Sequence, residues 1–369
     1  MITDTTSRNT MTVNFGPQHP STHGVLRLIV DIDGEIVRSC RPEIGYLHRG
    51  LEKMFESRSY RHNIPFTDRL DYLCSLANNL AICQAIERVG NVEVPERAKY
   101  LRVLMVELNR IASHLVFLGT FATDLGATTV FLYAFREREL LLDLLEAMTG
   151  ARLTYNWIRV GGMPADIPEG YGERVIAFLN QMRPRLDEND RLLTHNRIFR
   201  ARCEGIGVVK REDASAWGAT GPVARGSGVN LDIRKAAPYE IYDRLDFEVP
   251  VFDEGDVMAR YKVRIEEMRQ SARIVEQVLK TMPEGDIQTK LPKIFKPPAG
   301  EAYSRIESPR GELSFYLISD GTPNPVRIHI RAPSFIHLSL LQFMAKDIKV
   351  ADMIAVAGSL DPVMGEVDR

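Results

Sequence analysis

Residues 95–115 read PERAKYLRVLMVELNRIASHL. Apolar side chains recur along this stretch at spacings of three and four residues, at Leu101, Leu104, Leu108, Ile111 and Leu115. That spacing places them on one face of an α-helix, and Pro95 is tolerated in a first helical turn. The stretch therefore predicts a long amphipathic helix.

Four more stretches have the same periodicity and extend the prediction to a bundle of long helices. They span residues 70–89, 130–148, 171–196 and 257–282. Gly150 follows the second of them, where a glycine commonly ends a helix in a left-handed conformation.

Strands are predicted at both ends of the chain. Apolar residues alternate from Leu26 to Ile32 and again after the Asp33-Gly34 turn, which is typical of a hairpin. A second hairpin is predicted on either side of Asp320-Gly321, followed by a helix at 335–345 and an irregular tail packed into the protein. The predicted fold class is α+β, dominated by helices.

We divide the chain into five segments on this basis. Residues 1–64 form an N-terminal β domain, 65–205 the first part of the bundle, and 206–256 a glycine-rich insertion. Residues 257–285 supply a further bundle helix, and 286–369 form a C-terminal α+β segment with the packed tail.

Composition excludes several classes of function. A formal net charge of −2 gives no basic stripe for nucleic acid. The most apolar stretch, 115–135, contains Asp124, which is costly inside a membrane, so we expect it to be buried in protein. Residues 1–12 have the features of neither a signal nor a transit peptide. We therefore expect this chain to reach a membrane only through partners.

The four cysteines, Cys40, Cys74, Cys83 and Cys203, include no CxxC pair. A zinc or iron–sulfur site made by this chain alone is therefore not expected. Scattered cysteines of this kind suit a reducing compartment.

A few polar residues are candidates for function, each with a plainer alternative. His19 and His23 could stabilise a proline-rich loop, bind a metal or donate a proton to a substrate. Tyr72 could simply pack, with its hydroxyl bonded nearby. Asp124 could form a buried ion pair or cap a helix rather than take part in a reaction.

Several motifs resemble one known family. They are NFGPQHPSTHGVLR at 14–27, IGYLHRGLEK at 44–53, DRLDY at 68–72, ELNRIASHL at 107–115, DLGA at 124–127, FRERE at 135–139, GPVAR at 221–225, DIRK at 232–235 and GEVDR at 365–369. Together they resemble the quinone-site subunit of proton-pumping NADH:quinone oxidoreductases, the respiratory complex I family. The resemblance covers essentially the whole chain.

The resemblance implies roles for individual residues. His23 and Tyr72 would line the head of a quinone pocket and donate to the quinone oxygens, and Asp124 would pair with His23. Arg49 would lie near the terminal iron–sulfur cluster of a neighbouring subunit. Many relatives carry histidine at the position of Thr154, close to that cluster.

The resemblance also implies cofactors, partners and location. No cofactor or metal would be bound by this chain alone, quinone (ubiquinone or menaquinone) would be the substrate, and NADH and FMN would bind elsewhere in the complex. Partners would be the small subunit with the terminal cluster, a subunit of the C type and the membrane arm, where electron transfer drives proton pumping. The chain would be peripheral on the cytoplasmic side of the inner membrane.

Two alternatives come from other classes of protein. The family shares its fold with the large subunit of nickel–iron hydrogenases, which hold their metals with two CxxC pairs. At those positions this chain has Asp71 and Cys74, then Val363 and Glu366, and one thiolate cannot hold such a centre. The second alternative is a non-catalytic scaffold in a related oxidoreductase that uses another electron donor.

Overall fold

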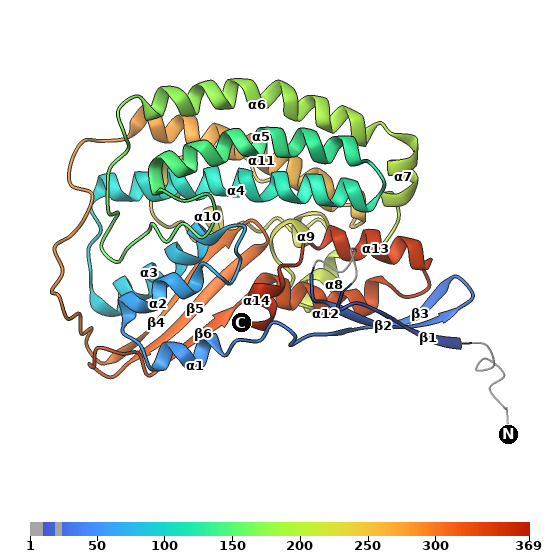
Figure 1. The fold of residues 1–369 in the computed structure, drawn as a ribbon, viewed down its shortest axis with the longest axis horizontal. Coiled ribbons are helices and arrows are strands. Elements are labelled where there is room, and N and C mark those ends of the chain that lie inside the picture. The colour runs from blue at the N-terminus through green and yellow to red at the C-terminus, as the bar shows by residue number, and fades with distance from the viewer. Residues whose placement is uncertain (1–9, 19–23) are drawn as a thin grey trace.

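The computed structural model describes residues 10–18 and 24–369. Long helices lie side by side and form one layer of the molecule (Figure 1). They are α4 (Glu96–Asp124), α5 (Thr128–Thr149), α6 (Tyr171–Thr194) and α11 (Val257–Thr281). All four confirm the predicted bundle, and Gly150 ends α5 with a φ of 76°, as expected.

Two antiparallel sheets of three strands accompany the bundle. The first contains β1 (Thr10–Phe15), β2 (Arg27–Asp33) and β3 (Ile36–Glu43), and the second β4 (Gly300–Ser308), β5 (Gly311–Ser319) and β6 (Arg327–Arg331). The first sheet projects from one end of the molecule in Figure 1. Both predicted hairpins, β2–β3 and β5–β6, are confirmed, whereas β4 was not predicted.

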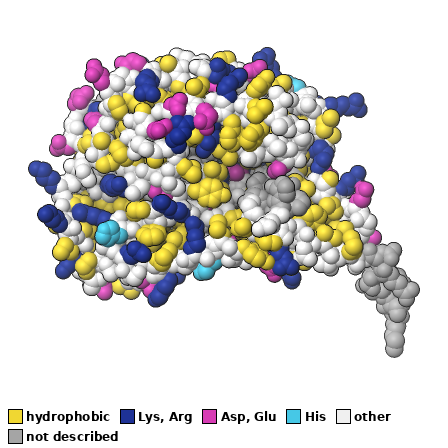
Figure 2. Space-filling view, in the orientation of Figure 1, with side chains coloured by type: hydrophobic (Ala, Val, Ile, Leu, Met, Phe, Trp, Pro, Cys, Tyr) yellow, Lys and Arg dark blue, Asp and Glu magenta, His cyan; other side chains and the backbone are white. Residues whose placement is uncertain are grey.

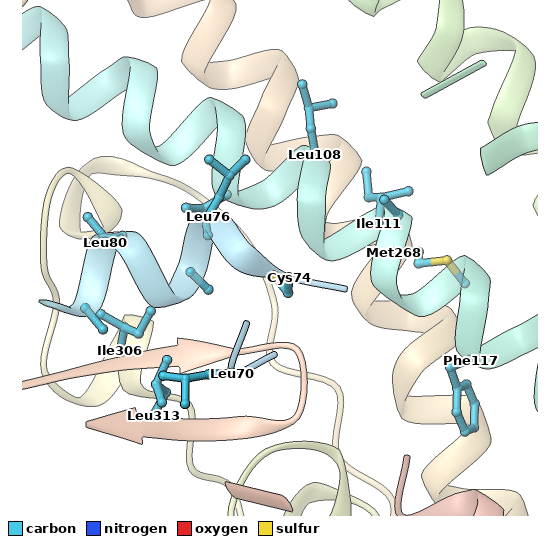
Figure 3. Close-up of a cluster of buried hydrophobic side chains, with 14 of the residues drawn as sticks. Leu70, Cys74, Leu76, Leu80, Leu108, Ile111, Phe117, Met268, Ile306 and Leu313 are labelled. Carbon is cyan, nitrogen blue, oxygen red and sulfur yellow. The ribbon is translucent and has the colours of Figure 1, made fainter. Parts of the chain in front are cut away.

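Helix α3 (Ser75–Gly90) is buried between the bundle and the second sheet. Figure 3 shows Leu76 and Leu80 of α3 near Ile306 and Leu313 of the sheet, with Leu108 of α4 above them. This apolar core fixes the position of α3, and with it the turn that precedes the helix.

Shorter elements complete the chain. They are α1 (Leu51–Glu56), α2 (Tyr60–Thr67), α7 (Arg197–Cys203), α8 (Arg211–Ala216), α9 (Gly221–Arg225), α10 (Ile233–Ala236), the 3₁₀ helix η3 (Tyr242–Arg244), α12 (Pro333–Met344), α13 (Val350–Ser359) and α14 (Met364–Asp368). The expected irregular tail is wrong, because α13 and α14 occupy most of it. The glycine content of residues 214–234 predicts an ordered loop, but the structure has short helices there as well as loop.

The apolar stretch 115–135 forms the corner between α4 and α5, and Asp124 is the last residue of α4. In the part of the chain that the structure describes, no helix is long and apolar enough to cross a membrane. The predicted α+β class with dominant helices is confirmed, and the division into five segments stays a prediction. On the face seen in Figure 2, basic, acidic and apolar side chains are interspersed.

Candidate functional site

Tyr72 lies in the short turn between α2 and α3. The Asp71 carboxylate beside it is 1% exposed and accepts the backbone N–H groups of Leu73 at 3.1 Å and Cys74 at 3.2 Å. Such bonds from an aspartate to the backbone N–H groups that follow it stabilise a turn, here the turn that precedes α3. The backbone around the half-buried Tyr72 is therefore held in one conformation.

Arg310 fastens this turn to two other parts of the molecule. Its Nη1 donates to Asp71 Oδ2 at 2.6 Å and to the hydroxyl of Ser113, on α4, at 3.1 Å. Its Nε donates to the carbonyl oxygen of Asp361 at 2.9 Å, and Nη2 lies 3.1 Å from the Asp361 carboxylate. Burial alone would lower the pKa of Arg310, but the carboxylates of Asp361 and Asp71 raise it overall. Arg310 is therefore a permanently charged clamp.

The C-terminal helix α14 packs directly onto the same turn. A Cβ atom added to Gly365 would come within 2.4 Å of the carbonyl oxygen of Leu70 and 3.4 Å of the Tyr72 ring. Arg49 bridges the two segments, because its Nη2 donates to the carbonyl oxygens of Arg69 at 2.8 Å and Gly365 at 2.9 Å. Only a residue without a side chain fits at position 365.

Further contacts tie the end of the chain to the loop before α1. The Asp368 carboxylate accepts the N–H groups of Gly45 at 2.8 Å and Leu47 at 2.7 Å. The carbonyl oxygen of Asp368 is 2.7 Å from Nδ1 of His48. Figure 1 shows the C-terminus beside α14, near the middle of the view.

Glu366 is the most deeply buried acid of α14. Its Oε1 accepts the N–H group of Ser334, at the start of α12, at 3.0 Å. Burial, and then the negative charge of Asp71, raise the pKa of Glu366 to about 7 against the opposing effect of Arg310. The carboxyl can therefore gain or lose a proton near neutral pH.

Tyr72 keeps its proton at neutral pH. Burial raises the pKa of the Tyr72 phenol. The positive charge of Arg310 lowers this pKa, whereas the carboxylates of Asp71 and Asp361 raise it further. A tyrosine ordinarily ionises near pH 10. Tyr72 can therefore offer a neutral, oriented O–H donor to a molecule that docks against the turn.

The structure brings two of the predicted site residues together and separates a third. Tyr72 and Arg49 meet at the turn, through Gly365. Asp124 lies on α4 eleven residues beyond Ser113, roughly 16 Å along the helix axis at 1.5 Å per residue. His23 lies outside the described residues, so its predicted pairing with Asp124 stays a prediction.

Thr154 lies close to the start of α3. The next residue, Tyr155, donates its backbone N–H to the hydroxyl of Ser75 at 3.2 Å. Thr154 itself is half-buried and has a φ of 52°, an uncommon conformation for a residue branched at Cβ. A separate cavity of about 760 Å³ lies nearby, lined by Asn156, Arg159, Arg61 and Lys290.

The positions that hold metal in hydrogenases are filled here by groups unsuited to a nickel–iron centre. Asp71 and Glu366 are carboxyl groups close to Arg310, and Val363 offers no donor atom. Cys74 is the one thiol, and burial raises its pKa far above the usual range. Among the described residues, no three histidine, cysteine or acidic side chains are grouped so as to hold a metal ion.

Arg310 and Asp361 are parts of the site that sequence reasoning missed. Arg310 occupies the turn between β4 and β5, where a basic residue usually faces solvent. Its complete burial follows from the segments that converge on it, and no local pattern signals that arrangement. Asp361 precedes a proline, which by itself indicates only a turn.

Comparisons with known proteins give a consistent result. Residues 124–369 match the family described as respiratory-chain NADH dehydrogenase, 49 Kd subunit, and residues 49–123 match nickel-dependent hydrogenase. The chain is similar to the D subunit of NADH-quinone oxidoreductase from Dehalococcoides mccartyi, with 53% identity over 97% of this chain and 98% of that protein. It is 51% identical to the same subunit from Geobacillus kaustophilus over 97% of this chain and 98% of the relative. Identity to a corresponding subunit from Rhizobium etli is 50%, covering 97% of this chain and 95% of the relative.

Proposed function

The chain belongs to the 49 kDa subunit family of respiratory-chain NADH dehydrogenase, and from that premise we propose that it forms the quinone-reduction site of an NADH:quinone oxidoreductase complex. The names of its relatives supply the reaction class. The observation that supports the site is Tyr72, a neutral donor in a turn fastened by Arg310, Arg49 and Gly365.

Reduction of a quinone to a quinol takes two electrons and two protons. Tyr72 orients one carbonyl oxygen of the quinone by donating its O–H, and gives up that proton as negative charge develops on the oxygen. His23 is proposed as the donor to the other oxygen, with Asp124 holding the imidazole in its charged form. The rigid turn favours the reaction because the donor does not have to reorganise.

The electrons are proposed to come from the terminal iron–sulfur cluster of a partner subunit. This chain's own thiols do not suit such a cluster, because all four cysteines are buried and separate. Burial raises the pKa of both Cys40 and Cys203 to about 12, so these thiols hold their protons rather than offer thiolates. Arg49 is proposed to lie toward the partner's cluster, where its positive charge stabilises the reduced form.

The proposed partners, membrane location and quinone are those that the family resemblance implies. The chain is proposed to act with the small subunit that carries the cluster, a C-type subunit and the membrane arm, in which electron transfer drives proton pumping. NADH and FMN bind elsewhere in the complex. The chain is proposed to lie on the cytoplasmic side of the membrane and to receive ubiquinone or menaquinone from it.

A scaffold without a catalytic role is the remaining alternative. Such a protein has no need of a half-buried phenol held among four charged groups, an arrangement that costs folding free energy. A scaffold would tolerate loss of the Tyr72 hydroxyl without change in any activity.

Tyr72→Phe in the intact complex tests the proposal. Removing the hydroxyl deletes the donor but keeps the ring, so quinone reduction should fall by about ten-fold or more. Electron flow from NADH to an artificial acceptor that bypasses the site should stay unchanged. An equal loss of both activities, or no loss of either, would overturn the assignment.

Tyr171→Phe is a matched control. Tyr171 is a buried tyrosine of α6 whose hydroxyl donates to the carbonyl oxygen of Leu144 at 3.2 Å. Its loss removes one hydrogen bond, worth about 1 kcal/mol, away from the site. Both activities should therefore remain at the unmodified level.

A further inference from the structure

A cluster of buried acids adjoins Tyr72. Asp71, Asp361 and Glu366 are at most 6% exposed and surround the fully buried Arg310. A second guanidinium, that of Arg264 on α11, interacts electrostatically with Asp361 and also with Glu267. Three carboxyl groups thus share two positive charges.

Such a cluster is electrically balanced only when one carboxyl carries a proton. An uncompensated charge in a buried site is costly, and a carboxyl group avoids that cost by staying protonated. We propose that Glu366 carries this proton, and that the Glu366 cluster (Asp71, Asp361 and Glu366 with Arg264 and Arg310) is a proton store that re-protonates Tyr72 after each quinone is reduced. The inference rests on the quinone-site function proposed above.

The hydrogen bonds indicate which acid carries the proton. Burial raises the pKa of Asp71, but Arg310 and two backbone N–H donors oppose this effect and stabilise its charged form. Asp361 lies within ion-pair distance of Arg310. Glu366 has only Ser334 as a hydrogen-bond donor, through its backbone N–H and its side chain, and Oε2 of Glu366 has no partner among the described residues. The pKa of Glu366, raised to about 7, agrees with this assignment.

The other groups near the cluster leave Glu366 as the exchangeable acid. His337 on α12 is fully buried, and burial lowers its pKa to about 3, so it is neutral. Cys74 keeps its proton because burial raises its pKa. Arg49 is bonded to backbone carbonyls, and Asp368, on the same helix as Glu366, accepts two backbone N–H groups.

The cluster is adjacent to Tyr72 on both sides. Asp71 precedes Tyr72 in the chain, and Gly365, whose added Cβ would lie 3.4 Å from the Tyr72 ring, precedes Glu366. The charges of Asp71, Asp361 and Arg310 all act on the phenol. Glu366 and Tyr72 thus share Asp71 and Arg310 as charged neighbours, and the proposed transfer between them runs through water.

The proton count closes over one turnover. The quinone gains two electrons from the partner's cluster, one proton from Tyr72 and one from the second donor. The Tyr72 phenolate then takes the proton of the Glu366 carboxylic acid, which becomes a carboxylate. Glu366 and the second donor each finally regain one proton from solvent water, and the site returns to its starting state.

Glu366→Gln in the intact complex is the test, because glutamine keeps the shape and neutrality of the acid but cannot give up a proton. In the unmodified complex quinone reduction should fall as pH rises through the Glu366 pKa near 7, since the store is then empty. The variant should be slower by about ten-fold at pH 6 and should lack this fall. Infrared difference spectra between oxidised and reduced complex should lose a protonated-carboxyl band in the variant.

Glu248→Gln is the control, since the Glu248 side chain is 81% exposed in this chain. It should change neither the pH profile nor the infrared band. An unmodified rate, profile and band in Glu366→Gln would overturn the proton store. If that variant also loses electron flow to the artificial acceptor, Glu366→Asp decides: a shifted profile supports the store, and an unshifted one overturns it.

Failure of this inference is distinguishable from failure of the proposed function. A selective loss in Tyr72→Phe together with normal behaviour in Glu366→Gln would keep the quinone site and remove the proton store. Normal quinone reduction in Tyr72→Phe would overturn both the quinone site and the proton store.

Discussion

Gly365 determines how closely two distant parts of the chain approach beside Tyr72. A Cβ there would lie 2.4 Å from the carbonyl oxygen of Leu70 and 2.7 Å from that of Arg69, and backbone atoms cannot move aside cheaply. Gly365→Ala should therefore push α14 away from the turn and lower the free energy of unfolding by about 1–3 kcal/mol. Quinone reduction should fall with it, as measured in the intact complex.

Gly172→Ala is the matched control for Gly365→Ala. Gly172 lies in the first turn of α6, and its added Cβ would meet only the Leu279 side chain, at 3.8 Å. Alanine is the better helix former there by up to about 1 kcal/mol. Denaturation should therefore show an equal or greater stability for Gly172→Ala, and a comparable loss in both variants would contradict the close-approach argument.

Thr154 carries a prediction about the iron–sulfur cluster that is proposed to belong to a partner subunit. A histidine close to such a cluster takes up a proton when the cluster is reduced, so the midpoint potential falls as pH rises between the two histidine pKa values. Threonine cannot do this. We expect a potential nearly independent of pH from about 6 to 8, and a slope after Thr154→His. Histidine suits the backbone, since it is among the residues that tolerate positive φ.

The structure places a titrating group, Asp68, in the region of Thr154. Asp68 is fully buried beside the backbone of Asn156, and burial raises its pKa to about 6. A redox titration of the unmodified complex that shows a slope, and keeps it in Asp68→Asn, would contradict the Thr154 prediction. If the slope disappears in Asp68→Asn, the pH dependence of the midpoint potential is due to the Asp68 carboxyl.

Among the secondary-structure elements, α11 is attached to its neighbours by ion pairs between buried side chains. Glu267 of α11 is 2.5 Å from Arg225 and 2.8 Å from His114, and all three side chains are fully buried. Removing one partner of a buried pair leaves the other charge without compensation. Glu267→Gln should lower the free energy of unfolding of the chain by about 3 kcal/mol in urea denaturation.

Glu276→Gln on the same helix is its control. Glu276 pairs with Arg183 at 2.7 Å, but both side chains are more than a third exposed. Exposed pairs contribute less than about 1 kcal/mol. Equal losses in the two variants would mean that burial does not decide the strength of these pairs.

The long helices could be predicted because each carries its own apolar periodicity. Strand β4 could not, since its buried positions include Ala302 and Ser304, whose small side chains hide the alternation. Helix α13 has a clear pattern in Val350, Met353 and Val356, and its omission was an error of interpretation. The five-residue α14 depends on its tertiary contacts, as short helices do.

At the scale of the whole molecule, the site is assembled from segments far apart in the sequence. Tyr72 and Arg49 were predicted only through the family resemblance. The clamp of Arg310, Asp71 and Asp361 was not, because nothing in a local stretch indicates that these three will meet. Sequence reasoning therefore predicted a donor role for Tyr72, which stays a prediction, but not the charged groups that surround it.

The two ends of the chain also pack together. The backbone N–H of Val37 in β3 donates to the carbonyl oxygen of Ile348 at 2.8 Å, and Glu52 of α1 pairs with Arg327 of β6 at 2.6 Å. The C-terminal residues thereby hold the loop before α1 against the Tyr72 turn. The position of the site is thus a property of the complete fold.

Photoaffinity labelling tests most directly whether a quinone head group binds against Tyr72. The intact complex is irradiated with a quinone analogue that carries a photoreactive group on its ring, and the labelled peptides of this chain are identified by mass spectrometry. We predict labels on residues 70–73 and on the α14 segment, reduced by excess unmodified quinone. Labels confined to the separate cavity lined by Arg61, Arg159 and Lys290, or labels that quinone does not displace, would contradict the account.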